Sequence, residues 1–235
     1  MMNKVQIVFF DAGGTLFEVK GSVGEIYGRF ARRYGVERDP LALTDAFSHS
    51  FRSQPPLAFP PGTSAAELDL LEREWWRQVV LASVSYFPGF DQYFNEVYEF
   101  FKSREAWVLF DDVIPTLTAL KERGLQLAII SNYDSRIDDL LRAFEIESFF
   151  AGVHVSSRAG AAKPDVAIFR AALSYHQFEP GEALHVGDSL RDDIEGAAAA
   201  GIRAVLLDRS RRYSRHEGLL RIDSLDALVK ISGYQ

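Results

Sequence analysis

Several polar side chains stand directly after short apolar runs of the sequence. Asp11, Ser131 and Asp188 each follow such a run, and Lys163 lies between the last two. Carboxylates alone repel a phosphate dianion, but a hard divalent cation held by their oxygens reverses that repulsion. A set of acids, hydroxyls and one ammonium is therefore typical of a site that binds a phosphate group together with Mg²⁺.

Each member of this set has a chemical use in phosphoryl transfer. Asp11, on a Gly-rich turn, could attack phosphorus and form an aspartyl-phosphate. Thr15, Ser131 and Asn132 can donate hydrogen bonds to phosphoryl oxygens, and Lys163 supplies a point charge for the same oxygens. Taken singly, these residues are common helix caps and turn residues. Their conjunction is what predicts a catalytic site.

The apolar runs themselves predict the scaffold. They are continuous rather than alternating, as in a parallel sheet that is covered on both faces. Helical patterns separate the last four, which indicates an α/β fold: a doubly wound, Rossmann-like parallel sheet with right-handed crossovers. Ligands of such sheets bind beyond the carboxyl ends of the strands, which is where the polar residues fall. The predicted strands are residues 5–10, 125–130, 152–155, 183–186 and 203–207.

Residues 18–106 break the strand–helix alternation. Apolar residues recur at helical spacing in three stretches, and four prolines between positions 55 and 61 interrupt them. We therefore expect an all-helical cap domain over residues 18–106, inserted into a discontinuous α/β core of residues 1–17 and 107–235. We expect Trp75 and Trp76 to lie in the interior or between the two domains, and the cap to select the substrate.

Two further patterns lie in the predicted core. Asp134 precedes apolar residues at helical spacing, so it is predicted to cap a helix that begins near Ile137. A basic run near the C-terminus is interpreted as a solvated loop. That run contains Arg209, Arg211, Arg212, Arg215 and His216.

In this order, the motifs resemble those of the haloacid dehalogenase superfamily. Ser131-Asn132-Tyr133-Asp134 and the Trp75-Trp76 pair with Val79-Val80 are also similar to a branch called the haloacid dehalogenase-like hydrolase domain-containing proteins. The match covers nearly the whole chain, with the helical insertion between the first and second motifs. The four motifs read Asp11-Ala12-Gly13-Gly14-Thr15-Leu16, Ile130-Ser131-Asn132, Lys163-Pro164-Asp165 and His185-Val186-Gly187-Asp188-Ser189 with Asp193.

The resemblance implies a role for each matching position. Asp11 is the implied nucleophile, and Thr15, Ser131 and Lys163 surround the transferring group. The implied Mg²⁺ ligands are Asp11, Asp188 and the main-chain carbonyl of Gly13, with Asp193 as a further carboxylate that acts directly or through water. The implied substrate is a small phosphorylated molecule.

Gly13 departs from the phosphatase pattern. Phosphatases of this superfamily usually carry a second Asp at this position, which protonates the leaving oxygen and later activates water. Loss of a positioned acid typically lowers the rate 10²–10⁴-fold, about 3–5 kcal/mol. We therefore expect activity toward leaving groups that depart as stable anions, such as those of acyl and aryl phosphates.

The same departure leaves two alternatives open. True 2-haloacid dehalogenases also lack that Asp, and Gly14-Thr15-Leu16-Phe17 is similar to their first motif, although they need no metal and usually lack the Gly-Asp of the fourth motif. A third possibility is a catalytically impaired fold that binds phosphate or a protein partner. The retained Asp11, Asp188, Asp193 and Lys163 favour the phosphatase.

The composition agrees with a globular enzyme. Of 235 residues, 47% are hydrophobic and 25% charged, and the formal net charge is −7, which disfavours nucleic-acid binding. The absence of cysteine excludes disulfides, cysteine nucleophiles and thiolate zinc sites. No apolar run approaches the roughly 18 residues of a membrane helix, and residues 1–10 do not resemble a signal peptide. We therefore expect a cytoplasmic protein with no membrane partner.

Overall fold

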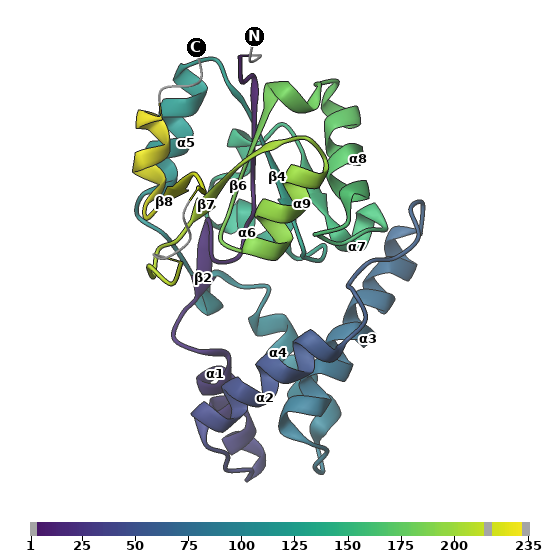
Figure 1. The fold of residues 1–235 in the computed structure, drawn as a ribbon. Coiled ribbons are helices and arrows are strands. Elements are labelled where there is room, and N and C mark those ends of the chain that lie inside the picture. Colours follow the sequence, from purple (N-terminus) through teal and green to yellow (C-terminus); the bar gives the residue numbers. More distant parts are fainter. Residues whose placement is uncertain (1–3, 214–217, 232–235) are drawn as a thin grey trace.

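The computed structural model describes residues 4–213 and 218–231 and is built around a parallel sheet (Figure 1). In this part of the chain the sheet has six strands in the order β5-β4-β1-β6-β7-β8, and all neighbours run parallel. The predicted α/β sheet is thus confirmed. The strands are β1 (Ile7–Phe10), β4 (Gln126–Ser131), β5 (Val153–Val155), β6 (Ala183–Gly187), β7 (Arg203–Leu207) and β8 (Arg221–Ile222).

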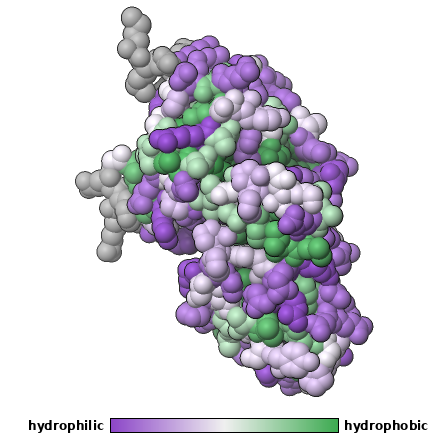
Figure 2. Space-filling model, turned by 90° about the vertical axis from the view of Figure 1, so that its right-hand side faces the viewer, coloured by the Kyte–Doolittle hydropathy of each residue, from purple (hydrophilic) through white to green (hydrophobic). Residues whose placement is uncertain are grey.

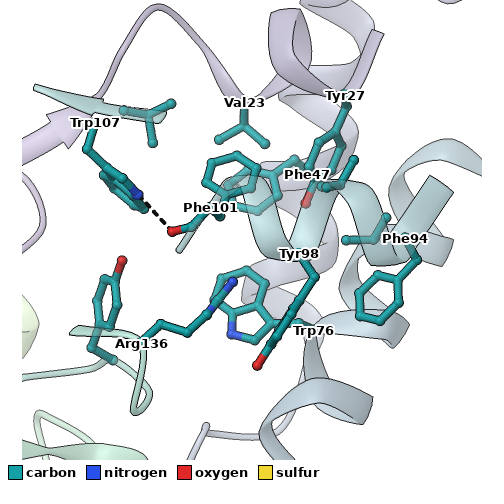
Figure 3. Close-up of a pocket in the computed structure, with 13 residues that line it drawn as sticks. Val23, Tyr27, Phe47, Trp76, Phe94, Tyr98, Phe101, Trp107 and Arg136 are labelled. Carbon is teal, nitrogen blue, oxygen red and sulfur yellow. Dashed lines mark hydrogen bonds between the residues drawn. The ribbon is translucent and has the colours of Figure 1, made fainter. Parts of the chain in front are cut away.

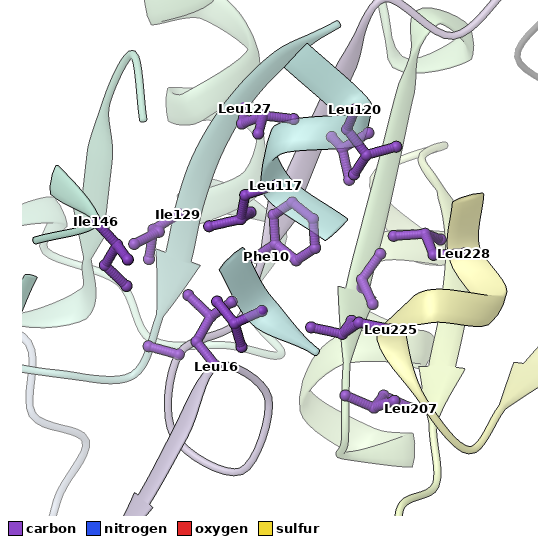
Figure 4. Close-up of a cluster of buried hydrophobic side chains, with 14 of the residues drawn as sticks. Phe10, Leu16, Leu117, Leu120, Leu127, Ile129, Ile146, Leu207, Leu225 and Leu228 are labelled. Atoms are coloured by element: carbon purple, nitrogen blue, oxygen red, sulfur yellow. The ribbon is translucent and has the colours of Figure 1, made fainter. Parts of the chain in front are cut away.

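Helices cover both faces of this sheet. Because successive side chains of a strand point to opposite faces, Val8 and Phe10 enter one apolar cluster while Ile7 and Phe9 enter another. Figure 4 shows Phe10 beside Leu117 in the first cluster. That cluster includes α5 (Val113–Glu122), α6 (Ile137–Ala143) and the 3₁₀ helix η6 (Leu225–Lys230), and the second includes α8 (Val166–His176) and α9 (Gly196–Ala199). The short helix α7 (Ser156–Ala159) follows β5.

A helical segment lies on one side of the sheet domain, at the bottom of Figure 1. Its cluster of buried side chains is rich in rings, Tyr27, Tyr93 and Tyr98 among them, whereas aliphatic side chains predominate around the sheet. Figure 2 shows a mainly hydrophilic surface with separate apolar areas over one face of the molecule. The segment contains α1 (Val23–Ala31), α2 (Pro40–Ser53), α3 (Ala65–Val84) and α4 (Phe90–Phe100).

A two-stranded antiparallel ribbon joins the segment to the sheet domain. It pairs β2 (Phe17–Val19) with β3 (Trp107–Leu109), so that Phe17 lies opposite Leu109 and Val19 opposite Trp107. The sequence did not predict this ribbon or β8, because these strands of two or three residues do not stand out as apolar runs: Glu18 and Arg221 interrupt them, and β3 directly follows a helical pattern. No helix among the described residues is long and apolar enough to cross a membrane.

Two predictions about single residues are wrong. Asp134 is not the cap residue of α6, which begins at Ile137 with no side-chain cap; its carboxylate accepts from the main-chain N–H of Arg136 at 2.9 Å, just before the helix, and also binds the buried Arg136 side chain in an ion pair, with Nη2 2.6 Å from Oδ2. A buried guanidinium needs such a partner. Arg209 is largely withdrawn from solvent, with 21% of its side chain exposed, because it pairs with Asp112 and stacks on Phe110, whereas Arg211 and Arg212 of the same run are exposed, as predicted. Arg215 and His216 of the predicted basic loop lie outside the described residues.

Candidate active site

The polar residues meet at one edge of the sheet because their strands are neighbours. Asp11 follows β1, Ser131 ends β4 and Asp188 follows β6, and β1 lies between β4 and β6. Parallel strands present their carboxyl ends at the same edge. Three segments far apart in the sequence therefore lie within hydrogen-bond or ion-pair reach of one another.

Lys163 is the centre of this group. Its side chain is buried, and its Nζ lies 2.6 Å from Asp11 Oδ1 and 2.6 Å from Asp193 Oδ1. Burial would lower the pKa of Lys163, but the two carboxylates raise it, so the ammonium stays charged. Lys163 thus holds a fixed positive charge beside the proposed nucleophile.

Asn132 positions the lysine segment. Its Nδ2 donates to the main-chain carbonyl of Lys163 at 2.9 Å, and the main-chain N–H of Lys163 donates to its Oδ1 at 2.7 Å. This pair of hydrogen bonds ties the end of β4 to the loop before α8. The side chain that was predicted to donate to a phosphoryl group is therefore already engaged in holding Lys163.

Asp11 is buried among donors. Ser131 Oγ donates to its Oδ1 at 2.9 Å, and Thr15 Oγ1 donates to its Oδ2 at 3.5 Å. Burial raises the pKa of Asp11, the charge of Lys163 lowers it and that of Asp193 raises it, and the net direction is upward. The carboxylate is thus desolvated and oriented, which suits a nucleophile.

Asp193 is the most fully hydrogen-bonded carboxylate of the group. Its Oδ1 also accepts from His185 Nε2 at 2.8 Å, and its Oδ2 accepts from the main-chain N–H of Ser189 at 3.0 Å. Burial would raise the pKa of Asp193, but Lys163 and His185 together lower it. His185 is an interior residue of β6, as the sequence indicated, and it fixes Asp193 from behind.

The acidic residues fit a divalent cation. Asp11, Asp188 and Asp193 each offer a ligand oxygen, and these oxygens lie within 4.8 Å of one another. If all three carboxylates were ionised, the single ammonium of Lys163 would leave two negative charges in a largely buried site. Burial and the neighbouring Asp11 raise the pKa of Asp188 to about 7, which reports this excess of negative charge. Outside the group, Arg212 Nη2 lies 3.7 Å from Asp188.

Two glycines make this close packing possible. A Cβ added at Gly14, which has a φ of +80°, would lie 2.7 Å from Asp188 Oδ2. A Cβ added at Gly187 would lie 2.1 Å from Asp193 Cγ. Any side chain at either position would displace an acidic residue, so these glycines of the first and fourth motifs are needed for close approach.

Gly13 differs from both, because nothing lies within 4 Å of a Cβ built on it. The position faces open space and its φ is not in the left-handed region. Lack of space therefore does not explain why the chain has no carboxylate at this position.

A hollow of about 300 Å³ opens in front of the acidic residues. One side of it is polar and includes Asp11, Asn132 and Lys163, whereas the other is aromatic. The aromatic side consists of Phe47, Phe51, Trp76, Trp107 and Tyr133, which come from both the helical segment and the sheet domain. The sequence placed Trp76 at the interface or in the interior, and Tyr133 belongs to a motif but had no predicted role at the site. Phe47, Phe51 and Trp107 belong to no motif and were not identified.

A polar junction connects the helical segment to the sheet domain beside this hollow. Trp76 Nε1 donates to Asp134 Oδ2, and the Arg136 guanidinium lies 4.8 Å from the Trp76 ring. Nearby, Glu72 Oε1 accepts from the main-chain N–H of Ser135 at 3.1 Å and from its hydroxyl at 2.9 Å. Burial raises the pKa of Glu72. The ion pair of Asp134 and Arg136 thus anchors the ring that lines the hollow.

Arg209 supports the loop that carries Asp11. Its Nη2 donates to the main-chain carbonyl of Thr15 at 2.9 Å, and both its Nη atoms lie 2.8 Å from the carboxylate of Asp112. Sequence reasoning missed this residue, since an arginine in a basic run carries no signal of a distant partner.

Comparisons with known proteins agree with this architecture. Haloacid dehalogenase-like hydrolase domain-containing protein 3 of Mus musculus is 33% identical over 209 residues, which cover 87% of this chain and 82% of that protein. Phosphoserine phosphatase of Thermus thermophilus is 36% identical over 115 residues, 48% of this chain and 46% of the phosphatase. The magnesium-bound structure of YfnB from Bacillus subtilis has the same fold, with a TM-score of 0.75 at 19% identity over 97% of this chain and 99% of that one.

A model of the whole family also matches most of the chain. A family model described as haloacid dehalogenase-like hydrolase matches residues 5–201, which include every motif residue named above. Together with the identity to the mouse protein over most of both chains, this match shows that the chain belongs to the haloacid dehalogenase-like hydrolase family.

Proposed function

We propose that this hydrolase is a Mg²⁺-dependent phosphatase that acts through an aspartyl-phosphate on Asp11. The observation that carries the proposal is the meeting of Asp11 with Lys163 and the two other acids: Lys163 Nζ is 2.6 Å from Asp11, and the three carboxylates lie within 4.8 Å of one another. The substrate is a small phosphorylated molecule that fits the hollow of about 300 Å³.

The reaction has two halves at Asp11. In the first, a carboxylate oxygen of Asp11 attacks phosphorus, the bond between phosphorus and the leaving oxygen breaks, and that oxygen departs with the electron pair. In the second, water attacks the aspartyl-phosphate, which releases inorganic phosphate and regenerates the carboxylate. Lys163 and the Ser131 hydroxyl, both bonded to Asp11 in the free protein, provide charge and a hydrogen bond for the phosphoryl oxygens.

Asp11, Asp188 and the main-chain carbonyl of Gly13 would hold the Mg²⁺, with Asp193 bound directly or through water. The bound ion supplies positive charge that screens the carboxylates from the phosphate dianion. Asp193 already bonds Lys163, His185 and Ser189, so we propose that it mainly fixes the ammonium and the geometry of the site.

Gly13 selects the leaving group. Without a carboxylate there, no positioned acid protonates the departing oxygen, and the loss is small only when the oxygen leaves as a stable anion. We therefore propose acyl or aryl phosphates as the substrates. Residues 18–106 act as a cap domain that closes over them, with hinges at residues 17–20 and 104–107, where β2 and β3 begin.

Dehalogenation is the second candidate, because Gly13 is also compatible with a halide leaving group. Asp188, which is half-buried, and Asp193, which is buried, argue against it, since together with Asp11 they form a set of carboxylate oxygens that suits a divalent cation. The name of the phosphoserine phosphatase relative also favours phosphoryl transfer.

Hydrolysis of p-nitrophenyl phosphate with and without Mg²⁺ tests the proposal. We expect Mg²⁺-dependent turnover in the wild type and a loss of at least about 10³-fold in Asp11→Asn, which keeps the size of the side chain but removes the nucleophile. Equal turnover by the two proteins would leave only a binding function. Chloride release from 2-chloropropionate without Mg²⁺ would establish the dehalogenase instead.

A further inference from the structure

A second, largely apolar cavity adjoins the candidate active site. Its volume is about 130 Å³, and eight of the thirteen side chains that line it are aromatic. Phe47, Trp76, Trp107 and Tyr133 line both this cavity and the hollow in front of Asp11. The two spaces therefore share four wall residues. The hollow also has charged lining residues, whereas the cavity is largely apolar.

The lining excludes a charged occupant. Among the described residues that line the cavity, Arg136 is the only charged one, and its guanidinium is paired with Asp134 at 2.6 Å. That guanidinium also lies 4.4 Å from the Tyr98 ring and 4.8 Å from the Trp76 ring, as Figure 3 shows around the cavity. Its charge is thus already balanced, and a second anion here would be desolvated without a free partner.

The size and chemistry of the cavity fit one aromatic ring. An apolar cavity of about 150 Å³ in a protein interior stays free of water and accepts benzene. Aromatic walls favour an aromatic occupant, since rings attract one another in edge-to-face and offset arrangements. The Tyr98 hydroxyl is buried and has no hydrogen-bond partner among the described residues, so the cavity wall also holds a polar group that its own surroundings do not satisfy.

We propose that this cavity binds the leaving group of the substrate and that the substrate class is a monocyclic aryl phosphate with an uncharged ring. This inference rests on the proposed phosphatase function and makes it more specific. Two independent features lead to the same class: Gly13 favours an oxygen that departs as a stable anion, and the cavity that shares walls with the hollow at Gly13 has the size and aromatic lining for a ring. When Asp11 attacks phosphorus, the bond between phosphorus and the aryl oxygen breaks, and the phenolate leaves with the electron pair and takes its proton from water.

Filling the cavity tests the proposal. Val23 is a half-buried residue of α1 that lines the cavity (Figure 3), so Val23→Phe places a ring where the substrate ring would lie. Val36→Phe is the matched control, because Val36 is also half-buried in the helical segment but does not line the cavity. The quantity measured is the ratio of kcat/KM for phenyl phosphate to kcat/KM for acetyl phosphate.

We expect this ratio to fall at least tenfold in Val23→Phe and to stay unchanged in Val36→Phe. An equal ratio in all three proteins would overturn the proposal and make the cavity a packing void only. Calorimetric titration of the wild type with phenylphosphonate and methylphosphonate, in the presence of Mg²⁺, gives an answer even if Val23→Phe does not fold. We expect the phenyl compound to bind at least tenfold more tightly; equal affinities would overturn the proposal.

The two measurements also separate this proposal from the phosphatase proposal. If neither phenyl phosphate nor acetyl phosphate is turned over but phenylphosphonate still binds more tightly than methylphosphonate, the phosphatase proposal fails, and the cavity is a site that binds an aromatic ring without a leaving-group role. If both phosphates are turned over and the ring adds no affinity, the phosphatase proposal stands and the cavity proposal fails.

Discussion

The hollow that Asp11 lines and the apolar cavity that adjoins it are stabilised by opposite physical effects. At the sheet edge, Lys163 lies between Asp11 and Asp193 at 2.6 Å from each, and the balance of buried charges determines the geometry. In the adjoining cavity, Tyr27, Phe94 and Phe101 contribute apolar contacts, and the single charge of Arg136 is cancelled by Asp134. The charged space can hold a reacting group, whereas the apolar one can only select what is attached to it.

In the proposed reaction, the two parts of the fold have separate tasks. Residues at the carboxyl ends of β1, β4 and β6 would perform the same phosphoryl chemistry for any substrate. The helical segment contributes most of the aromatic wall and would therefore determine which leaving group is accepted. Trp76 belongs to both, because it lines both spaces and bonds Asp134 of the sheet domain.

Restoring an acid at position 13 should weaken the contrast between the charged hollow and the apolar cavity most. A Cβ at Gly13 meets nothing within 4 Å, so Gly13→Asp is expected to fold and to supply the missing proton donor. We expect turnover of alkyl phosphates to rise about 10²-fold or more, with a smaller gain for phenyl phosphate, because only poor leaving groups need protonation. Gly13→Ala is the control for a side chain without a carboxyl. Steady-state rates with a series of leaving groups of increasing pKa measure the effect; a slope that is flat in the wild type, or the same in Gly13→Asp, would contradict this account.

Removing the charge of Asp134 should weaken the junction between the helical segment and the sheet domain. Asp134→Asn leaves the buried Arg136 guanidinium without its counter-charge and weakens the hydrogen bond from Trp76. We expect the free energy of unfolding to fall by about 3 kcal/mol, measured by urea denaturation. Asp138→Asn is the control, since Asp138 forms an ion pair with the partly exposed Arg158. Similar losses in the two variants would show that the buried pair has no special importance.

Changing the pH should affect the charged space alone. The pKa of Asp188 rises from 3.8 in the unfolded chain to about 7 in the folded protein without metal, so the folded state binds the proton more tightly. Its contribution to stability is therefore present below pH 4 and is lost as the pH rises toward 7. Relative to Asp188→Asn, we expect the wild type in EDTA to lose about 1–3 kcal/mol between pH 4 and 7.5.

Mg²⁺ should reverse this trend, because the ion favours the ionised carboxylate. The rise in Tm that Mg²⁺ produces should be larger at pH 7.5 than at pH 5 in the wild type and small at both values in Asp188→Asn. A wild-type Tm that rises equally at the two pH values would show that Asp188 does not titrate in this range.

The predicted parts of the site are those whose position follows from strand order. Asp11, Ser131 and Asp188 end apolar runs, and the carboxyl ends of parallel strands meet at one edge, so their proximity could be inferred without coordinates. The strand at residues 203–207 was predicted with its observed bounds. The junction was not predicted, because Asp134 has a helix-cap pattern and its partnership with Arg136 arises only from burial.

The sequence alone therefore determined the fold class, the family and the residues available for chemistry, because apolar runs and the motifs that follow them are local properties of the chain. Only the tertiary structure decided that Asn132 holds Lys163, that His185 supports Asp193, and that aromatic side chains from several elements enclose a cavity that adjoins the hollow at Asp11. A cavity forms between elements that are distant in the chain, and no local pattern encodes the distance between them.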